Sequence, residues 1–240
     1  MPLPKISTPT YELTLPSTGK KIKYRPFLVR EEKILIMAME SENMKDITNS
    51  IVQILSDCIL TENVKVESLA TFDIEYLFLN VRARSVGEAV DVNIVCPDDG
   101  ETQVEVSIDI DSIRIQKTRG HKNVIKLDDN LFMKLRYPAL EQFVENNFET
   151  ADAGSGVGES LAMITSCIDI IYNEEESWEA SDYSKDELDE FVEQMNTKQF
   201  KQIEKFFTTM PKLSHTIKVR NPNTKVESEV ILEGLASFFS

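Results

Sequence analysis

Residues 90–109 read Val-Asp-Val-Asn-Ile-Val-Cys-Pro-Asp-Asp-Gly-Glu-Thr-Gln-Val-Glu-Val-Ser-Ile-Asp, and this stretch decides the fold class. Apolar and polar side chains alternate on both sides of Cys96–Glu101, which is the pattern of two half-buried β-strands. The Pro-Asp-Asp-Gly between them has the composition of a turn. The stretch therefore predicts an antiparallel β-hairpin.

Further strand pairs are expected on both sides of this hairpin. Each consists of two alternating segments joined by residues that favour turns. The expected pairs are Tyr11–Leu15 with Ile22–Tyr24 around Pro16–Gly19, Asn123–Leu127 with Leu131–Arg136, and Thr216–Arg220 with Val226–Leu232 around Asn221–Lys225.

Apolar residues at helical spacing separate these pairs. A helix is expected at Asp46–Leu60, where Cys58 lies on the apolar face and is interpreted as a small buried hydrophobe. The other helices are expected at Glu31–Met39, at Thr71–Arg84 with Gly87 as a left-handed stop, from Pro138 onward, at Leu161–Tyr172, at Asp186–Met195 and at Lys198–Met210. Asp152–Gly158 is expected to be a flexible break and Asn173–Ser184 a polar loop. Because strands and helices do not alternate regularly, we predict an α+β fold with antiparallel β-hairpins, separate helical blocks and no parallel doubly wound sheet.

This order of elements divides the chain into four parts. Residues 1–87 are expected to form an N-terminal β-hairpin with helices, and residues 88–137 a β-rich region. Residues 138–211 follow as an acidic helical region, and residues 212–240 as a C-terminal β-hairpin with an apolar tail. We expect the last part to be able to pack with residues 88–137 as one unit.

The composition is that of a folded protein without a membrane span. The chain has 240 residues, of which 41% are hydrophobic and 28% charged, and this is enough to bury a core. Its longest uncharged stretch, Ile47–Ser56, is far shorter than the about 18 apolar residues of a spanning helix. The N-terminus lacks the apolar segment of a signal peptide. Three widely spaced cysteines form no disulfide framework, which favours folding in a reducing cytoplasm.

The net charge of −15 comes from one segment. Between Glu141 and Met195 there are 16 acidic residues and a single basic one, Lys185, whereas the rest of the chain is neutral. A surface of this kind repels phosphate backbones, so we expect no nucleic-acid partner. It fits a basic protein partner, although a solvated acidic face is the commoner explanation.

The usual catalytic patterns do not occur in the sequence. Gly154–Ser160 resembles a phosphate-binding loop but lacks the Lys-Ser/Thr of a P-loop, so a linker or the start of a helix is the better interpretation. His121 and His215 lie outside metal-ligand spacings and are interpreted as surface residues. Carboxylates are plentiful, but a glycosidase pair needs a defined separation in a cleft, which a sequence does not show. We therefore predict no catalytic residues, no cofactor and no small-molecule substrate.

One turn resembles half of a zinc site. Cys96–Gly100 has the form of the zinc-knuckle turn Cys-Pro-X-Cys-Gly, with Asp99 in place of the second cysteine. Structural zinc takes about four Cys or His ligands, and the turn of the last hairpin, Asn221–Lys225, contains neither residue type. We therefore predict a metal-free hairpin of zinc-ribbon type.

A few residues are candidates for partner binding. Trp178 is the single tryptophan, and this residue type is enriched where protein interfaces are strongest. Packing into the local core is the alternative for Trp178, and a solvated turn or a weak cation site is the alternative for the acidic cluster before it. The other candidates are Glu174, Glu175 and Glu176 in that cluster, and Phe238 and Phe239 near the C-terminus.

Three blocks of the sequence carry a family resemblance. They are Tyr11–Lys20 with Tyr24–Leu35, Phe72–Tyr76 with Arg82–Glu88, and Leu232–Leu235 with Phe238 and Phe239. Together they resemble the T-even-type bacteriophage baseplate protein family, which includes the baseplate hub subunit and the related hub assembly protein. The resemblance covers most of the chain except the acidic segment from about Phe148 to Met195.

The resemblance implies a non-enzymatic role in building the phage tail, as a hub subunit or a hub assembly factor. The implied partners are other phage baseplate hub or tail proteins, and the implied place of action is the host cell cytoplasm during assembly. A permanent subunit of the virion tail baseplate and a chaperone that leaves after assembly both remain open. The alternatives from other classes are a tail-associated cell-wall hydrolase and an acidic regulatory domain unconnected with phage.

Overall fold

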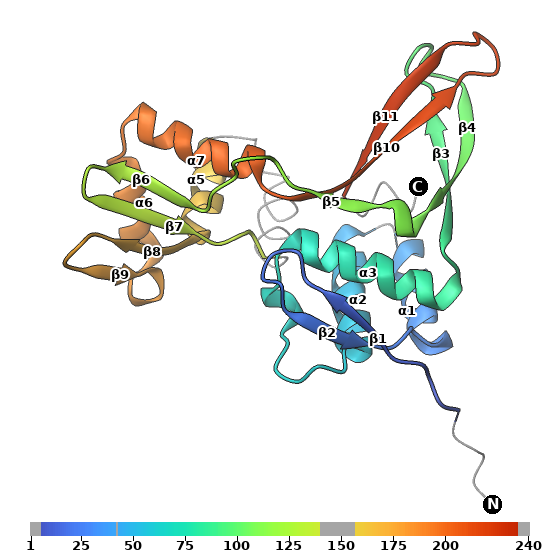
Figure 1. Cartoon of the computed structure of the whole chain (residues 1–240), viewed down its shortest axis with the longest axis horizontal. Coiled ribbons are helices and arrows are strands. Elements are labelled where there is room, and N and C mark those ends of the chain that lie inside the picture. The colour runs from blue at the N-terminus through green and yellow to red at the C-terminus, as the bar shows by residue number, and fades with distance from the viewer. Residues whose placement is uncertain (1–5, 42, 140–156, 235–240) are drawn as a thin grey trace, which may run out of the picture. The chain divides into compact units, whose positions relative to one another are not determined.

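The computed structural model describes residues 6–41, 43–139 and 157–234 (Figure 1). The chain forms two compact units: unit 1 contains Met1–Gln116 and Lys212–Ser240, and unit 2 contains Lys117–Pro211. Both units combine helices with antiparallel strands, so the predicted α+β class is confirmed. The four-part division of the chain remains a prediction. No helix in the described ranges has the length and apolar character needed to cross a membrane.

Unit 1 begins with the predicted hairpin. β1, Tyr11–Thr14, pairs antiparallel with β2, Lys21–Tyr24, and Gly19 has the positive φ of 72° that suits their turn. The side chain of Asp73 accepts hydrogen bonds from both the N–H and the hydroxyl of Ser17, the former at 3.0 Å. These bonds tie the turn to the first turn of the third helix.

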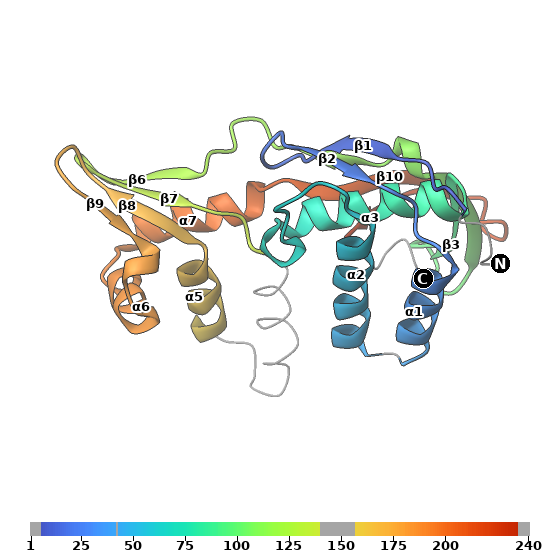
Figure 2. The same ribbon diagram turned by 90° about the horizontal axis from the view of Figure 1, so that it is seen from below.

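Three helices follow close to their expected positions. They are α1, Val29–Glu40; α2, Met44–Cys58; and α3, Thr71–Val86, with the short 3-10 helix η1, Val66–Ser68, before α3. α1 and α2 lie side by side (Figure 2). Gly87 does end α3, but its φ of 128° and ψ of 158° are not the left-handed helical values that we predicted. This extended conformation, which is open almost only to glycine, leads the chain directly into the next strand.

The two later hairpins of unit 1 lie in separate sheets. Among the described strands, β3, Ala89–Val95, pairs with β4, Gln103–Asp109, alone. β10, Lys212–Arg220, lies between β11, Glu227–Glu233, and the short β5, Arg114–Gln116, which the sequence did not reveal and which follows the 3-10 helix η2, Ile110–Ser112. The inward-facing residues of both sheets share one core with α3, formed by Leu79, Ala83, Val90, Val92, Ile94, Ile108, Ile110, Ile113, Leu213, Ile217, Val219 and Leu232.

Unit 2 is a four-stranded antiparallel sheet with helices packed against it. In spatial order the strands are β6, Val124–Asp128; β7, Leu131–Leu135; β8, Ile168–Tyr172; and β9, Ser177–Glu179. The helices are α5, Val157–Ser166; η3, Ala180–Asp182; α6, Lys185–Glu193; and α7, Thr197–Thr209. Figure 2 shows α5 and α6 on the same side of the sheet. Sheet and helices share a second core, which includes Ile125, Met133, Leu135, Ile164, Ile168, Val192, Ile203 and Phe206.

Two predictions in unit 2 are wrong. The helix expected at Leu161–Tyr172 ends at Ser166, because Ile168–Tyr172 pairs with β7 as a strand. A continuous apolar run is ambiguous by periodicity, and its three Ile residues and a Tyr favour the strand. The loop expected at Asn173–Ser184 contains β9, which completes the sheet. The helix expected after Pro138 falls on residues 140–156, outside the described residues.

The flexible break expected at residues 152–158 also falls mostly outside the described residues. Val157 and Gly158, its last two positions, already belong to α5.

Candidate functional site: protein-contact surfaces

The acidic cluster at residues 174–176 forms the turn between β8 and β9. Glu174, Glu175 and Glu176 are all exposed. The side chain of Asn173 accepts hydrogen bonds from the backbone N–H groups of Glu175, at 2.8 Å, and of Glu176, at 2.7 Å. This Asx-type turn fixes the backbone, so the three carboxylates are held close together on the surface.

Further exposed carboxylates lie on the elements that follow this turn. Asp182 belongs to η3, and Asp186, Glu190 and Glu193 belong to α6. We call these four residues together with Glu174–Glu176 the acidic region. Within the described residues, none of the seven carboxylates takes part in an ion pair. Exposed charges without a counter-ion act on approaching molecules over about 8 Å at physiological salt.

Two other acids of the same segment have structural roles instead. Oε2 of Glu187 accepts hydrogen bonds from the N–H and the hydroxyl of Ser184, both at 2.8 Å, and these bonds lower the pKa of Glu187 while they cap α6. Oδ1 of Asp189 accepts from the hydroxyl of Thr165 at 2.6 Å, which links α6 to α5. Counting acids in the sequence therefore overstates how many are available to a partner.

The structure places Trp178 at the edge of the core of unit 2. Trp178 pairs with Ile171 of the neighbouring strand, is half-buried and packs against the core cluster. This packing is the local-core alternative considered for Trp178, and a role in partner binding stays a prediction. Tyr183, which directly follows the acidic residue Asp182, is 41% exposed. Sequence reasoning missed Tyr183, although an aromatic residue next to acidic residues was the available signal.

The remaining candidates from the sequence are Phe238 and Phe239, and both lie outside the described residues.

α1 shows an exposed apolar surface that the sequence analysis did not predict. Its exposed apolar residues are Val29, Ile36, Met37 and Met39, of which Val29 is 80% exposed, whereas Leu35 and Ala38 of the same helix are buried. Apolar side chains gathered on the outer side of a helix are a common feature of protein-contact surfaces.

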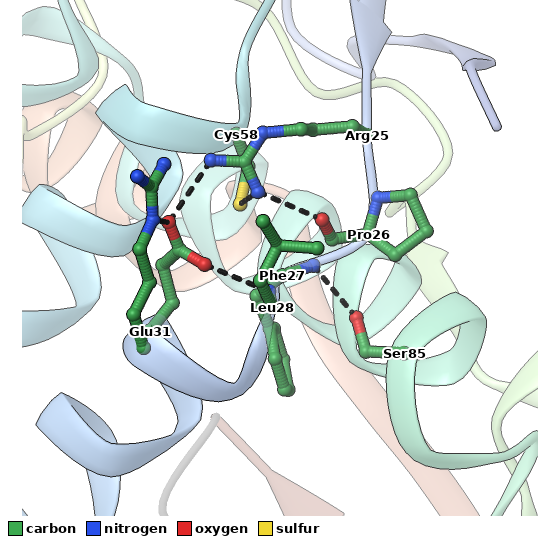
Figure 3. Close-up of polar contacts among 8 residues, drawn as sticks. Arg25, Pro26, Phe27, Leu28, Glu31, Cys58 and Ser85 are labelled. Carbon is green, nitrogen blue, oxygen red and sulfur yellow. Dashed lines mark hydrogen bonds and ion pairs between the residues drawn. The ribbon is translucent and has the colours of Figure 1, made fainter. Parts of the chain in front are cut away.

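A buried ion pair holds the start of α1 in place (Figure 3). Nη2 of Arg25 donates to Oε1 of Glu31 at 2.9 Å, and Nη1 of Arg25 donates to the carbonyl oxygen of Pro26 at 2.9 Å. The same Nη1 lies 3.6 Å from Sγ of Cys58, at the end of α2. Oε2 of Glu31 accepts from the N–H of Leu28 at 2.7 Å. The Glu31 carboxylate therefore organises the connection from β2 to α1, and Arg25 joins this connection to the end of α2.

The same connection is also tied to α3, and Glu31 remains ionised in the interior. The N–H of Phe27 donates to the hydroxyl of Ser85 at 2.9 Å. Burial opposes ionisation of Glu31, but the hydrogen bonds from Arg25, Arg30 and a backbone N–H outweigh burial and lower the pKa of Glu31 to about 2. A carboxylate of this kind stabilises the fold and donates no proton near neutral pH.

The cysteines have the environment of packing residues. Cys58, Cys96 and Cys167 are buried and unbridged. Burial raises the pKa of Cys58 and of Cys167 to about 11, so both thiols stay protonated and unreactive at neutral pH. In the described ranges, no three residues among His, Cys, Asp and Glu are grouped so as to hold a metal ion.

His121 is half-buried and not the surface residue that we expected. Its Nδ1 lies 2.9 Å from the hydroxyl of Thr209, and its Nε2 lies 3.1 Å from the hydroxyl of Tyr137. The Thr209 hydroxyl donates to the carbonyl oxygen of Lys205 at 2.6 Å, so Nδ1–H is the donor to Thr209 and Nε2 accepts from Tyr137. The ring also packs against Phe206, at 5.2 Å between centroids. His121 therefore joins the start of unit 2 to the end of α7.

A comparison with protein families gives a match over nearly the whole chain. The family model described as "T4 bacteriophage base plate protein" matches residues 8–240. The match includes the acidic segment, which the resemblance of the three sequence blocks left out. No curated protein and no solved structure gives a significant match.

Proposed function

The chain belongs to the T4 bacteriophage base plate protein family, and we propose that it is a non-enzymatic subunit or assembly factor of the baseplate hub. In this role it acts through contacts with other hub or tail proteins, in the host cell cytoplasm while the tail is built. Family membership over residues 8–240 is the observation that carries the proposal.

The acidic region supports a role in protein contacts. Its seven exposed carboxylates have no counter-ions among the described residues, and Tyr183 lies within it with a partly exposed ring. Such a surface attracts a basic protein and raises the rate of encounter, because the field acts before contact is made. The same charge keeps nucleic acid away. We therefore expect the hub partner that binds unit 2 to present a basic surface.

Association kinetics with purified hub proteins tests this proposal. We expect the association rate constant to fall steeply as salt rises, while the dissociation rate constant changes little. The variant E174Q/E175Q/E176Q should associate roughly several-fold more slowly at low salt and show a weaker salt dependence. The matched control D91N/E101Q/E105Q removes three exposed acids from unit 1 and should behave as the wild type.

Equal association rates for the two variants, or binding that does not respond to salt, would dismiss steering by the acidic region while leaving a hub role open. Failure to bind any hub or tail protein would contradict the proposed function itself. Mass spectrometry of purified particles then separates a permanent subunit from an assembly factor that leaves. Release of peptidoglycan fragments by the pure protein would instead identify the cell-wall hydrolase.

A further inference from the structure

Two turns of unit 1 have the same backbone geometry. They are Cys96–Gly100, between β3 and β4, and Asn221–Lys225, between β10 and β11. In each turn the N–H of the fifth residue donates to the carbonyl oxygen of the first, at 2.9 Å in the former and 3.0 Å in the latter. The fifth residues, Gly100 and Lys225, have positive φ values of 70° and 68°. A positive φ is uncommon for lysine, so the second turn holds this shape against the preference of its own sequence.

The side chains of the two turns bond directly to each other. Nδ2 of Asn221 donates to Oδ2 of Asp99 at 2.7 Å and lies 3.1 Å from Oδ1 of Asp98. The hydroxyl of Thr224 donates to Oδ2 of Asp98. Asn221 and Cys96, the first residues of the two turns, are both buried, although each begins a surface turn. Residues about 120 positions apart in the sequence thus converge at one point.

Asn221 also makes the hydrogen bonds that a metal-bound thiolate makes at the first position of a zinc knuckle. Its Oδ1 accepts from the N–H groups of Asn223, at 2.8 Å, and of Thr224, at 3.2 Å. Bonds of this kind orient and support a ligand in a metal site. The Nδ2 group meanwhile presents positive hydrogens to two carboxylates, as a bound cation would. One amide therefore supplies both the support of the turn and the link across it.

We propose that Cys96, Asp99, Asn221 and Thr224 occupy the four ligand positions of a zinc ribbon, with hydrogen bonds across the turns in place of the metal. With thiolates at all four positions, this scaffold takes a tetrahedral divalent cation such as Zn²⁺. Neighbouring sulfurs in such a site are about 3.8 Å apart, as follows from a Zn–S distance of about 2.3 Å. Nδ2 of Asn221 and Oδ2 of Asp99, which lie 2.7 Å apart across the turns, are compatible with that spacing.

The variant D99C/N221C/T224C, which keeps Cys96, tests the four positions with Co²⁺ as the probe. We expect one equivalent of Co²⁺ per chain, the visible absorption of a tetrahedral tetrathiolate site, and displacement of Co²⁺ by Zn²⁺. The control E101C/P222C/V226C adds the same number of thiols at other positions, one within the second turn and one directly after each turn. It should bind Co²⁺ at least 100-fold more weakly and without the tetrahedral spectrum.

Binding by the triple variant that does not exceed that of the control overturns the proposal. Because bound zinc contributes its binding energy to folding, a triple variant that stays unfolded in the presence of Zn²⁺ overturns it equally. A second measurement needs no metal: Asn221→Asp keeps the Oδ1 acceptor but replaces the donor that faces Asp98 and Asp99. We expect its melting temperature to fall by roughly 5 °C or more, and a melting temperature equal to that of the wild type contradicts the proposed link.

Discussion

Replacing Glu31 by glutamine should destabilise the protein by about 3 kcal/mol. Glu31 is fully buried and bonded to Arg25, and its pKa is lowered from 4.5 to about 2. That difference is about 2.5 units, and each unit corresponds to about 1.36 kcal/mol, so the ionised carboxylate stabilises the folded state by about 3 kcal/mol at neutral pH. Breaking a buried ion pair by removing one partner costs about 3–5 kcal/mol in other proteins, which agrees with this value.

The effect of the Glu31→Gln substitution should depend on pH in a defined direction. The pKa of Glu31 is lower in the folded than in the unfolded state. Its contribution to the free energy of unfolding is therefore fully present above the unfolded pKa of 4.5. Below that value the contribution decreases, and it is lost as pH falls towards about 2. The difference in free energy of unfolding between wild type and E31Q should therefore be constant from pH 7 to about 5 and disappear near pH 2.

Urea unfolding followed by far-ultraviolet circular dichroism measures this difference. The matched control is Glu32→Gln, which removes an acid from the same first turn of α1 at a partly exposed position. We expect this control to cost no more than about 1 kcal/mol, which is the size of a helix-dipole contribution. Equal unfolding midpoints for E31Q and E32Q, or a difference that persists unchanged at pH 2–3, would refute the argument.

Three further predictions concern stability and reactivity. Ser17→Ala removes the hydroxyl bond to the buried carboxylate of Asp73 and leaves the bond from the backbone N–H. It should lower the free energy of unfolding by about 1–3 kcal/mol in urea, more than the neighbouring change Thr18→Ala. Burial lowers the pKa of His121, so the unfolded ring takes up a proton at a higher pH than the folded one. The free energy of unfolding of the wild type should therefore fall relative to that of His121→Phe as pH falls below about 6.5. A difference in free energy of unfolding between the two proteins that does not change with pH would contradict this prediction. The three buried cysteines should react with a thiol reagent only after urea is added, and fast labelling of the folded protein would contradict their packing role.

Local patterns in the sequence were sufficient to predict most of the elements. The hairpins around residues 16–19 and 96–101 depend on alternation and turn composition over fewer than twenty residues, and the structure confirms both. α7 was predicted because its apolar residues recur on one face. The short strands β5 and β9 were missed, because three residues carry too little pattern and pair only through the presence of longer neighbours.

The candidate site was predictable in charge but not in detail. The acidic turn at Glu174–Glu176 is exposed, as its composition indicates. The sequence did not reveal that Glu187 and Asp189 have internal partners, because their partners are set by the capping of α6 and by its packing on α5. Likewise, nothing near His121 indicates the pairing with Thr209, which lies 88 positions away.

The two polar clusters of unit 1 have a common structural role, because each holds several elements in one arrangement. The Arg25–Glu31 pair lies in the block Tyr24–Leu35, which carries part of the family resemblance, and it holds β2, α1 and α2 in one arrangement. The hydrogen bonds from Asn221 to Asp98 and Asp99 hold the two later hairpins together in the same way. Apolar packing tolerates small shifts and repacking at little cost. Directional hydrogen bonds between charged or buried groups are broken by such shifts, so they favour a single arrangement of the elements that they join. The block Tyr24–Leu35 therefore has a structural role in unit 1, and we expect substitutions at Arg25 and Glu31 to impair partner binding only as far as they lower stability. Substitutions in the acidic region should instead change the association rate constant with the partner without changing the unfolding midpoint.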